Sequence, residues 1–247
     1  MPERFYVLGV PVSVTSPDRC LEDIVRWSSD NFGRFICMRD VHGVMRARRD
    51  AELARAHDNA AIVAPDGAPL ALIGKFRGLP VKRTTGPDLM DMVMDKGRQT
   101  GLRHYLYGGT PGVADQLKTV FEARYPGCRI VGTYCPPFRP LTEDEEDMVL
   151  QDIADSDAQL VWVGLSTPKQ ELWMLRTAAR TETTMIGVGA AFDFHTARIK
   201  RAPLWMRNCG LEWAHRLWSE PRRLWQRYLV LAPLFVFLVL FGRDRKG

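Results

Sequence analysis

Two charged residues of this 247-residue chain are placed where they could deprotonate a hydroxyl or bind a phosphate. Asp66 comes directly after an apolar stretch, between Pro65 and Gly67. An aspartate at the end of a strand can act as a general base when a hydroxyl lies within hydrogen-bond reach. In a Pro-Asp-Gly context it can equally close an Asx-turn or cap a helix, and its position alone favours that structural role. Arg83 lies in a loop before a helical stretch, where a guanidinium could clamp a phosphate or stay solvated.

Small or glycine-rich turns follow several of the apolar stretches, in YLYGGTPG (105–112), VGLSTPKQE (163–171) and GVGAAFDF (187–194). Glycine lets a backbone approach a phosphate closely, so Gly108 and Gly109 are candidate substrate-binding residues. None of these turns has the GxGxxG spacing of dinucleotide-binding folds or the Walker A spacing of ATP-binding folds. The turns therefore disfavour a dinucleotide cofactor and ATP.

The segment from 160 to 171 predicts a phosphate-binding type of turn. It reads as a short strand over 160–163, a small-residue turn, and a helix that starts at Pro168 with Thr167 as its N-cap. Such a helix start offers free N–H groups and a positive dipole end at the carboxyl edge of a sheet. Gln170, in the first turn of this helix, could reach a ligand there or could be an ordinary surface residue.

Strand and helix patterns alternate along most of the chain. Apolar stretches predict strands at residues 35–38, 60–64, 102–107, 129–133, 160–163 and 184–188. Helical spacing is found at residues 41–57, 70–76, 88–99, 113–124, 143–154 and 168–180. This alternation predicts βαβ units. The expected fold is therefore α/β and Rossmann-like, with a largely parallel sheet flanked by helices.

Composition argues against a metal or disulfide site. The five cysteines are scattered without CxxC spacing, which fits a reducing compartment, and the five histidines show no ligand spacing. Asp155 and Asp157 have the DxD spacing of metal-bound nucleotide-sugar sites, but they lie between a predicted helix and the start of a strand. That position is the amino edge of the sheet, away from the strand-end turns. No metal, no cofactor and no signal peptide are expected.

From Arg198 onward the chain changes character. Arginine and lysine dominate residues 198–228, where the only acids are Glu212 and Glu220 and the interleaved tryptophans are Trp205, Trp213, Trp218 and Trp225. Residues 229–241 are uncharged and apolar, but too short for the roughly 20 residues of a transmembrane helix. This combination favours a segment in the membrane interface, with burial against the sheet or a short spanning helix as alternatives. We expect an α/β core over 1–197 and a basic, Trp-rich, helical, membrane-associating appendage over 198–247.

Several motifs occur together in a family-specific order. They are APDGAPL (64–70), RTTGPDLM (83–90), YLYGGTPGVA (105–114), VGLSTPKQELW (163–173), GVGAAFDF (187–194) and KRAPLWMRNCGLEWAHRLWSEPRRLWQRYL (200–229). The chain thereby resembles the bacterial WecG/TagA/CpsF glycosyltransferases, glycosyltransferase family 26, over nearly its whole length from about residue 35. The resemblance implies an inverting, metal-independent enzyme that moves a hexosyl unit from a UDP-sugar to a polyprenyl-diphosphate-linked sugar. It implies a role in exopolysaccharide or other cell-surface polysaccharide assembly, at the cytoplasmic face of the inner membrane as a peripheral protein.

The resemblance also implies roles for individual residues. Asp66 matches the family's Pro-Asp-Gly aspartate and would be the base on the acceptor hydroxyl, while Arg83 would hold the diphosphate. Gln170 and Asp193 would line the UDP-sugar pocket. The basic positions of the tail would meet substrate phosphates and the membrane; they are Arg216, Arg222, Arg223 and Arg227.

One stretch departs from the family's pattern. Where many members carry Thr-x-Asn after the second strand, this chain has Met38, Arg39 and Asp40. Asp40 is therefore a candidate donor-binding residue that carries a charge in place of an amide. The donor stays open between N-acetylmannosamine and a glucosyl, galactosyl or uronosyl unit.

Two other functions fit parts of the sequence. A membrane-tethered basic module could bind nucleic acid or acidic lipid through the arginines and tryptophans of the tail, but this gives the Pro-Asp-Gly and glycine-rich turns no role. A nicotinamide-dependent oxidoreductase is disfavoured by the missing GxGxxG spacing. The expected partners are a UDP-sugar, a lipid-linked acceptor and the membrane surface, without nucleic acid. Whether the protein forms a homo-oligomer stays open.

Overall fold

The computed structural model of the protein describes residues 1–242, except for the side chains of Asn208 and Arg223. Six strands form one sheet in the order β4-β3-β8-β7-β5-β6, and every neighbouring pair in it is parallel. These strands are β3 (Arg34–Arg39), β4 (Ile62–Pro65), β5 (Arg103–Gly108), β6 (Arg129–Tyr134), β7 (Leu160–Gly164) and β8 (Thr184–Gly187). The predicted α/β, Rossmann-like architecture is confirmed.

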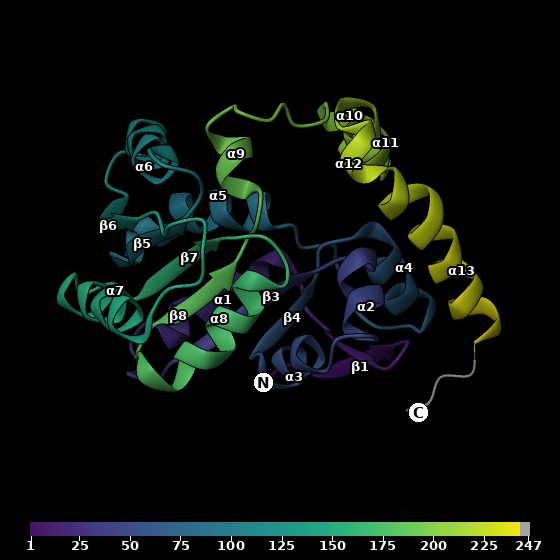
Figure 1. Cartoon of the computed structure of the whole chain (residues 1–247), viewed down its shortest axis with the longest axis horizontal. Coiled ribbons are helices and arrows are strands. Elements are labelled where there is room, and N and C mark those ends of the chain that lie inside the picture. Colours follow the sequence, from purple (N-terminus) through teal and green to yellow (C-terminus); the bar gives the residue numbers. More distant parts are fainter. Residues whose placement is uncertain (243–247) are drawn as a thin grey trace.

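Helices cover both faces of the sheet (Figure 1). Because both faces are covered, successive residues of a strand are buried on opposite sides: in β7, Trp162 packs in one apolar cluster and Val161 in the other. The first cluster includes α1 (Pro17–Trp27), α5 (Gly86–Lys96), α6 (Val113–Arg124) and α9 (Ala191–His195). The second includes α7 (Glu143–Asp155) and α8 (Lys169–Thr177), and α3 (Ala51–Asn59) packs beside α8.

A small hairpin closes the β4 side of the sheet. Its strands, β1 (Arg4–Val7) and β2 (Val10–Ser13), are antiparallel, and the Ser13 hydroxyl accepts a hydrogen bond from the Val63 N–H at 3.0 Å. The hairpin forms an apolar cluster with α2 (Val41–Ala47) and α4 (Ala68–Phe76), which we call the hairpin cluster. The edge strand β4 is therefore not left open to other chains.

Four local expectations are wrong in detail. The helix expected over 41–57 is broken into α2 and α3, because the Asp50 carboxylate caps α3 by accepting the Leu53 N–H at 3.0 Å. Helix α8 begins one residue later than predicted, at Lys169, and Pro168 takes the N-cap position. Thr167 is not the cap; its hydroxyl instead donates to the Glu171 carboxylate at 3.0 Å. The turn expected over 187–194 runs into the short helix α9.

The C-terminal segment, residues 198–242, is helical and lies over the end of the molecule that holds α2 and α4 (Figure 1, yellow). It consists of α10 (Leu204–Asn208), α11 (Glu212–Ser219), α12 (Pro221–Trp225), a π-helical turn η3 (Gln226–Leu231) and α13 (Ala232–Phe241). Phe235 of α13 is buried in the hairpin cluster, whereas Phe237 and Phe241 are exposed. Among residues 1–242, no helix has the length and apolar character needed to cross a membrane.

A buried ion pair joins the end of β3 to the start of α8. Nη2 of Arg39 donates to Oε1 of Glu171 at 2.7 Å, and both side chains are buried. The same carboxylate oxygen accepts from the Thr167 hydroxyl and from the Gln170 amide. Helix α2 lies directly on the guanidinium, since a Cβ at Gly43 would come within 1.9 Å of Arg39 Nη1. The pair therefore holds β3, α2 and α8 in one arrangement.

We predict that Glu171→Gln lowers the free energy of unfolding by roughly 3–5 kcal/mol, because it leaves the Arg39 charge buried without a counter-ion. Urea unfolding followed by circular dichroism measures this change. The control is Asp95→Asn, which removes the exposed Arg98–Asp95 pair and should cost less than about 1 kcal/mol. Equal effects of the two substitutions would contradict the assignment of Arg39–Glu171 as a stabilising contact.

Candidate functional site

The carboxyl ends of β3 and β4 bring two acidic residues side by side. Arg39 and Pro65 are register partners in these parallel strands, and the next residue of each strand is Asp40 and Asp66 respectively. Both aspartates line a cavity of about 310 Å³ that the C-terminal segment helps to enclose. The remaining walls are largely apolar: Val41, Ala68, Pro69, Pro87, Val188, Ala190, Ala191, Phe194, Trp213, Tyr228 and Ala232.

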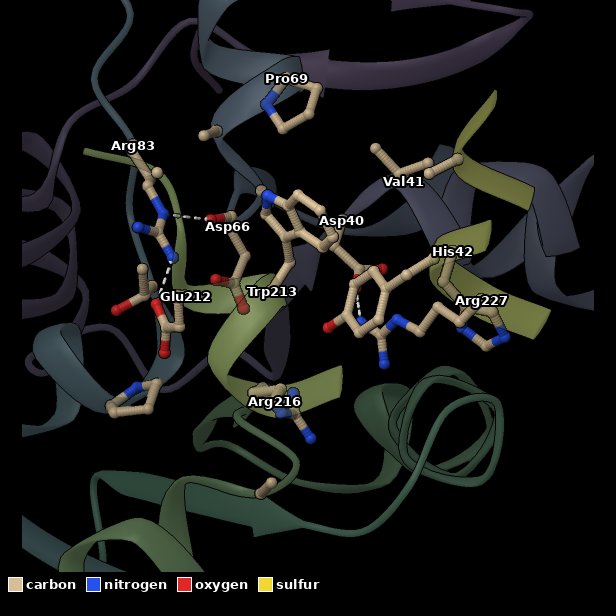
Figure 2. Close-up of a pocket in the computed structure, with 18 of the residues that line it drawn as sticks. Asp40, Val41, His42, Asp66, Pro69, Arg83, Glu212, Trp213, Arg216 and Arg227 are labelled. Carbon is tan, nitrogen blue, oxygen red and sulfur yellow. Dashed lines mark hydrogen bonds and ion pairs between the residues drawn. The ribbon is translucent and has the colours of Figure 1, made fainter. Parts of the chain in front are cut away.

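Hydrogen bonds hold the backbone on both sides of Asp66, and its side chain lines the cavity. The Asp66 N–H donates to the Arg39 carbonyl at 2.8 Å, and the Pro65 carbonyl accepts from the Thr84 N–H at 2.9 Å. The N-cap residue of α4 is Gly67, and no side-chain cap bond is made there. The helix-capping role that position alone favours for Asp66 is therefore not observed. Figure 2 shows its carboxylate in the open space between the labelled side chains.

The environment of Asp66 makes its carboxylate basic. Burial raises its pKa from 3.8 to about 6; the nearby Arg83 opposes this shift, while Glu212 and Asp88 add to it. Burial is the largest of these influences and exceeds the attraction of the Arg83 guanidinium, so the pKa rises. A carboxylate with a pKa near 6 is suited to accept a proton close to neutral pH.

Arg83 connects this turn to the C-terminal segment. Its Nε donates to the Asp66 carbonyl at 2.8 Å, its Nη1 to the Arg207 carbonyl at 3.3 Å and its Nη2 to the Glu212 carboxylate at 2.7 Å. Arg201 adds a second connection through a bidentate pair with Asp88, at 2.7 and 2.9 Å. Arg83 thus lines the cavity, as the sequence suggests, but its hydrogen bonds are made within the protein.

Two further arginines of the C-terminal segment reach the cavity. Arg227 forms an ion pair with Asp40, whose other carboxylate oxygen caps α2 by accepting the Gly43 N–H at 2.9 Å. Arg216 stacks over Phe194 at 5.6 Å, and its closest described carboxylate, that of Glu220, is 3.9 Å away. Among the described cavity arginines, Arg216 is therefore the least neutralised by carboxylates.

Several expected site residues are not among the described residues that line this cavity. Gln170 is buried. Its Oε1 accepts from the Gly189 N–H at 3.0 Å, and its amide NH₂ donates to the Glu171 carboxylate. Gln170 therefore connects the turn between β8 and α9 to the start of α8. Its predicted place in a ligand pocket is not supported, because these internal partners use its polar atoms. Asp193 lies on α9 beside Phe194, which lines the cavity, and Arg222 is exposed on α12. The side chain of Arg223 lies outside the described residues.

Gly108 and Gly109 serve the packing of two strand ends. A Cβ at Gly108 would lie 2.7 Å from the backbone of Gly164, and the Gly109 N–H donates to the Gly164 carbonyl at 3.0 Å. The glycines are thus required where β5 and β7 approach each other. The expectation that they admit a phosphate is not supported in this structure, since the Gly109 N–H already has a partner.

The structure adds cavity residues that sequence patterns do not identify as a site. They are His42, Glu212, Trp213 and Tyr228. Burial, together with the charges of Arg46 and Arg39, lowers the pKa of His42, so its imidazole is neutral at pH 7. The sequence feature that could have indicated one of these cavity residues is that Glu212 is a rare acid in a basic segment.

Within residues 1–242, no group of three or more histidine, cysteine or acidic side chains is arranged to hold a metal ion.

We predict that Asp66→Asn stabilises the protein at alkaline pH. Because the pKa of Asp66 is about 6 in the folded protein and 3.8 is its ordinary value, the folded state binds the proton more tightly; the resulting loss of stability builds up between about pH 4 and pH 6 and is fully present above pH 6. Removing the charge should raise the free energy of unfolding at pH 8 by on the order of 2 kcal/mol, a gain that fades as the pH falls to 4.

Denaturant unfolding at both pH values tests this, with the exposed Asp144→Asn as the control. The control should change little at either pH. A gain for Asp66→Asn that is as large at pH 4 as at pH 8 would show that the carboxyl is not held at a raised pKa.

The amino-acid sequence also matches a known protein family. The sequence profile described as the glycosyl transferase WecG/TagA/CpsF family matches residues 5–246, nearly the whole chain. The match confirms the resemblance that the sequence motifs indicate. It identifies a glycosyltransferase of cell-surface polysaccharide synthesis, an enzyme that uses a sugar donor and an acceptor. The chain therefore belongs to the WecG/TagA/CpsF family of glycosyltransferases.

Proposed function

We propose that this glycosyltransferase moves a hexosyl unit from a UDP-sugar to a polyprenyl-diphosphate-linked sugar, with inversion and without a metal or other cofactor. The observation that carries the proposal is the carboxylate of Asp66. It has a pKa of about 6, faces a cavity of about 310 Å³, and shares this cavity with Arg83, Arg216 and Arg227. A displacement at an anomeric carbon needs such a base on one side and cationic support for the departing phosphate on the other.

In this mechanism Asp66 takes the proton of the attacking acceptor hydroxyl. The freed oxygen forms a bond to the anomeric carbon of the donor while the bond from that carbon to the UDP oxygen breaks. The electron pair of the broken bond leaves with UDP, and the single displacement inverts the anomeric centre. The largely apolar walls exclude water, which strengthens the electrostatic interactions inside the cavity.

The arginines are proposed to stabilise the diphosphate charges. Arg216 is the first candidate, because its nearest described carboxylate is 3.9 Å away and a phosphate could approach closer. Arg227 and Arg83 are paired with Asp40 and Glu212 and would serve a phosphate only by exchanging these partners. Asp40 would then be released toward the donor, whose sugar stays open between N-acetylmannosamine and a glucosyl, galactosyl or uronosyl unit.

The C-terminal segment is proposed to seat the protein on a membrane. Residues 1–197 would form the catalytic core and residues 198–247 the membrane-associating part. Exposed apolar side chains are concentrated in this segment: Leu204, Trp205, Trp218, Trp225, Leu229, Val230, Val236, Phe237, Leu240 and Phe241. Basic residues accompany them, as is typical of interfacial helices. A peripheral position on the inner membrane's cytoplasmic face would bring the cavity to a lipid-linked acceptor.

Family membership favours this reaction over the alternatives. A nicotinamide-dependent oxidoreductase has no support from a glycosyltransferase family. A module that binds nucleic acid through the basic tail would need its arginines free, whereas Arg201, Arg207 and Arg227 contact acidic residues of the core.

We predict that Asp66→Asn lowers the turnover number at least about 100-fold while UDP still binds, because the variant loses the proton acceptor but keeps the cavity. In the wild type, kcat/KM should fall below about pH 6 as Asp66 becomes protonated. The assay is transfer from a panel of UDP-sugars to an alkyl-diphosphate-linked sugar, with calorimetry for UDP and Asp144→Asn as the control. Near-normal turnover by Asp66→Asn would remove this residue from the mechanism.

A second prediction concerns the exposed face of α13. Phe237 and Phe241 are 58% and 72% exposed, so replacing both by serine removes apolar surface without emptying the core. Sedimentation with vesicles that contain phosphatidylglycerol should show binding weakened at least about tenfold. The control is Phe138→Ser, a 98% exposed residue outside the C-terminal segment, which should leave vesicle binding unchanged. Equal losses in the two proteins would count against α13 as the membrane contact.

A further inference from the structure

Trp213 presents a large aromatic side chain to the cavity. It is 45% exposed although it lies on the wall of an enclosed site. Its ring is tilted by 46° against that of Tyr228, with centroids 5.9 Å apart, and Tyr228 lines the same cavity. Figure 2 shows the Trp213 side chain next to Asp66 and turned toward the interior of the site. The indole therefore forms part of the cavity wall beside the carboxylate.

The position of Trp213 relative to Asp66 is fixed by hydrogen bonds. Trp213 follows Glu212, whose carboxylate accepts from Arg83 at 2.7 Å. The same guanidinium donates to the Asp66 carbonyl at 2.8 Å. Two hydrogen bonds of one planar guanidinium thus connect the residue before the indole to the residue that carries the proposed base. Such a connection is what a binding surface needs in order to hold a reacting group in register with a base.

A sugar ring is the ligand that fits this surface. A pyranose presents one face of C–H groups and a rim of hydroxyls, so its apolar face can pack on the negative face of an aromatic ring while a hydroxyl points sideways. A uracil ring can also stack on tryptophan. However, the base must reach the hydroxyl of the acceptor and not the nucleotide, and the exposed indole lies beside that base.

We propose that Trp213 is the surface on which the sugar ring of the acceptor packs, so that its attacking hydroxyl faces Asp66. This assignment rests on the proposed glycosyl transfer. It adds a residue that selects and orients the acceptor, distinct from the arginines that meet phosphate groups. Arg216, one turn further along α11, lies on the same helix and also lines the cavity. One helix thereby offers an apolar surface for the sugar ring and a cation for a phosphate.

The test compares Trp213→Leu with Phe138→Leu in the full-length protein. Phe138 is 98% exposed, lies outside the C-terminal segment and does not line the cavity, so it is the control for the loss of an exposed aromatic ring. Octyl-diphosphate-linked glucose and N-acetylglucosamine serve as acceptors, a panel of UDP-sugars as donors, and calorimetry gives the Kd for UDP. Trp213→Leu should raise KM for the acceptor about tenfold while the Kd for UDP changes less than about twofold.

A second variant separates packing from folding. Trp213→Phe keeps an aromatic face and should retain most of the acceptor affinity, even if Trp213→Leu proves too unstable to assay. An unchanged acceptor KM in Trp213→Leu would overturn the inference, and so would an increase confined to the Kd for UDP, which would place uracil on the indole. These outcomes leave the proposed transfer intact as long as the wild type turns over. A wild type that neither binds UDP nor transfers sugar would overturn the proposed function, and this inference with it.

Discussion

The hydrogen bonds of the Arg83 guanidinium are the contacts on which the shape of the cavity depends. It donates to the Asp66 carbonyl, to the Arg207 carbonyl and to the Glu212 carboxylate. Because a guanidinium holds its donors in a rigid planar fork, the acceptors are kept in one arrangement. Asp66 belongs to a strand-end turn of the sheet, whereas Arg207 and Glu212 belong to the C-terminal segment. Arg83 therefore joins the two parts of the site, together with the Arg201–Asp88 and Arg227–Asp40 pairs, and neither part encloses the cavity without the other.

The C-terminal segment also contributes to the proton affinity of Asp66. A guanidinium beside a carboxyl ordinarily lowers the pKa of that carboxyl. Here burial outweighs the attraction of Arg83 and raises the pKa of Asp66 to about 6. Docking of the C-terminal segment thus does more than close the cavity. It adds Glu212, which raises the pKa of Asp66 further, and Arg201, which opposes that rise, so the basicity of the strand-end aspartate also depends on a segment more than a hundred residues further along the chain.

Periodicity and turn chemistry predict the sheet because each strand and helix is a local pattern. The places of Asp40 and Asp66 follow directly, since residues after parallel strands gather at one edge. The partners of these residues do not follow, because the Arg83–Glu212 contact joins residues 129 positions apart and depends on tertiary packing. Gln170 illustrates the same limit. Its sequence position indicates a ligand-facing helix start, yet its amide is used by Gly189 and Glu171.

One side of the C-terminal segment lines the cavity and another is exposed, and three successive helical elements connect them. Helix α12, the turn η3 and α13 follow one another from Pro221 to Phe241. Tyr228 lines the cavity, Phe235 is buried in the hairpin cluster, and Phe241 is exposed. At 1.5 Å per residue, Tyr228 and Phe241 are about 20 Å apart along the helix. Because Phe235 fixes this helix to the core, a membrane that contacted Phe241 would stand at a set distance from Asp66. A lipid-linked acceptor would then enter the cavity from one direction, so the choice of its attacking hydroxyl would depend on this helix as much as on the cavity walls.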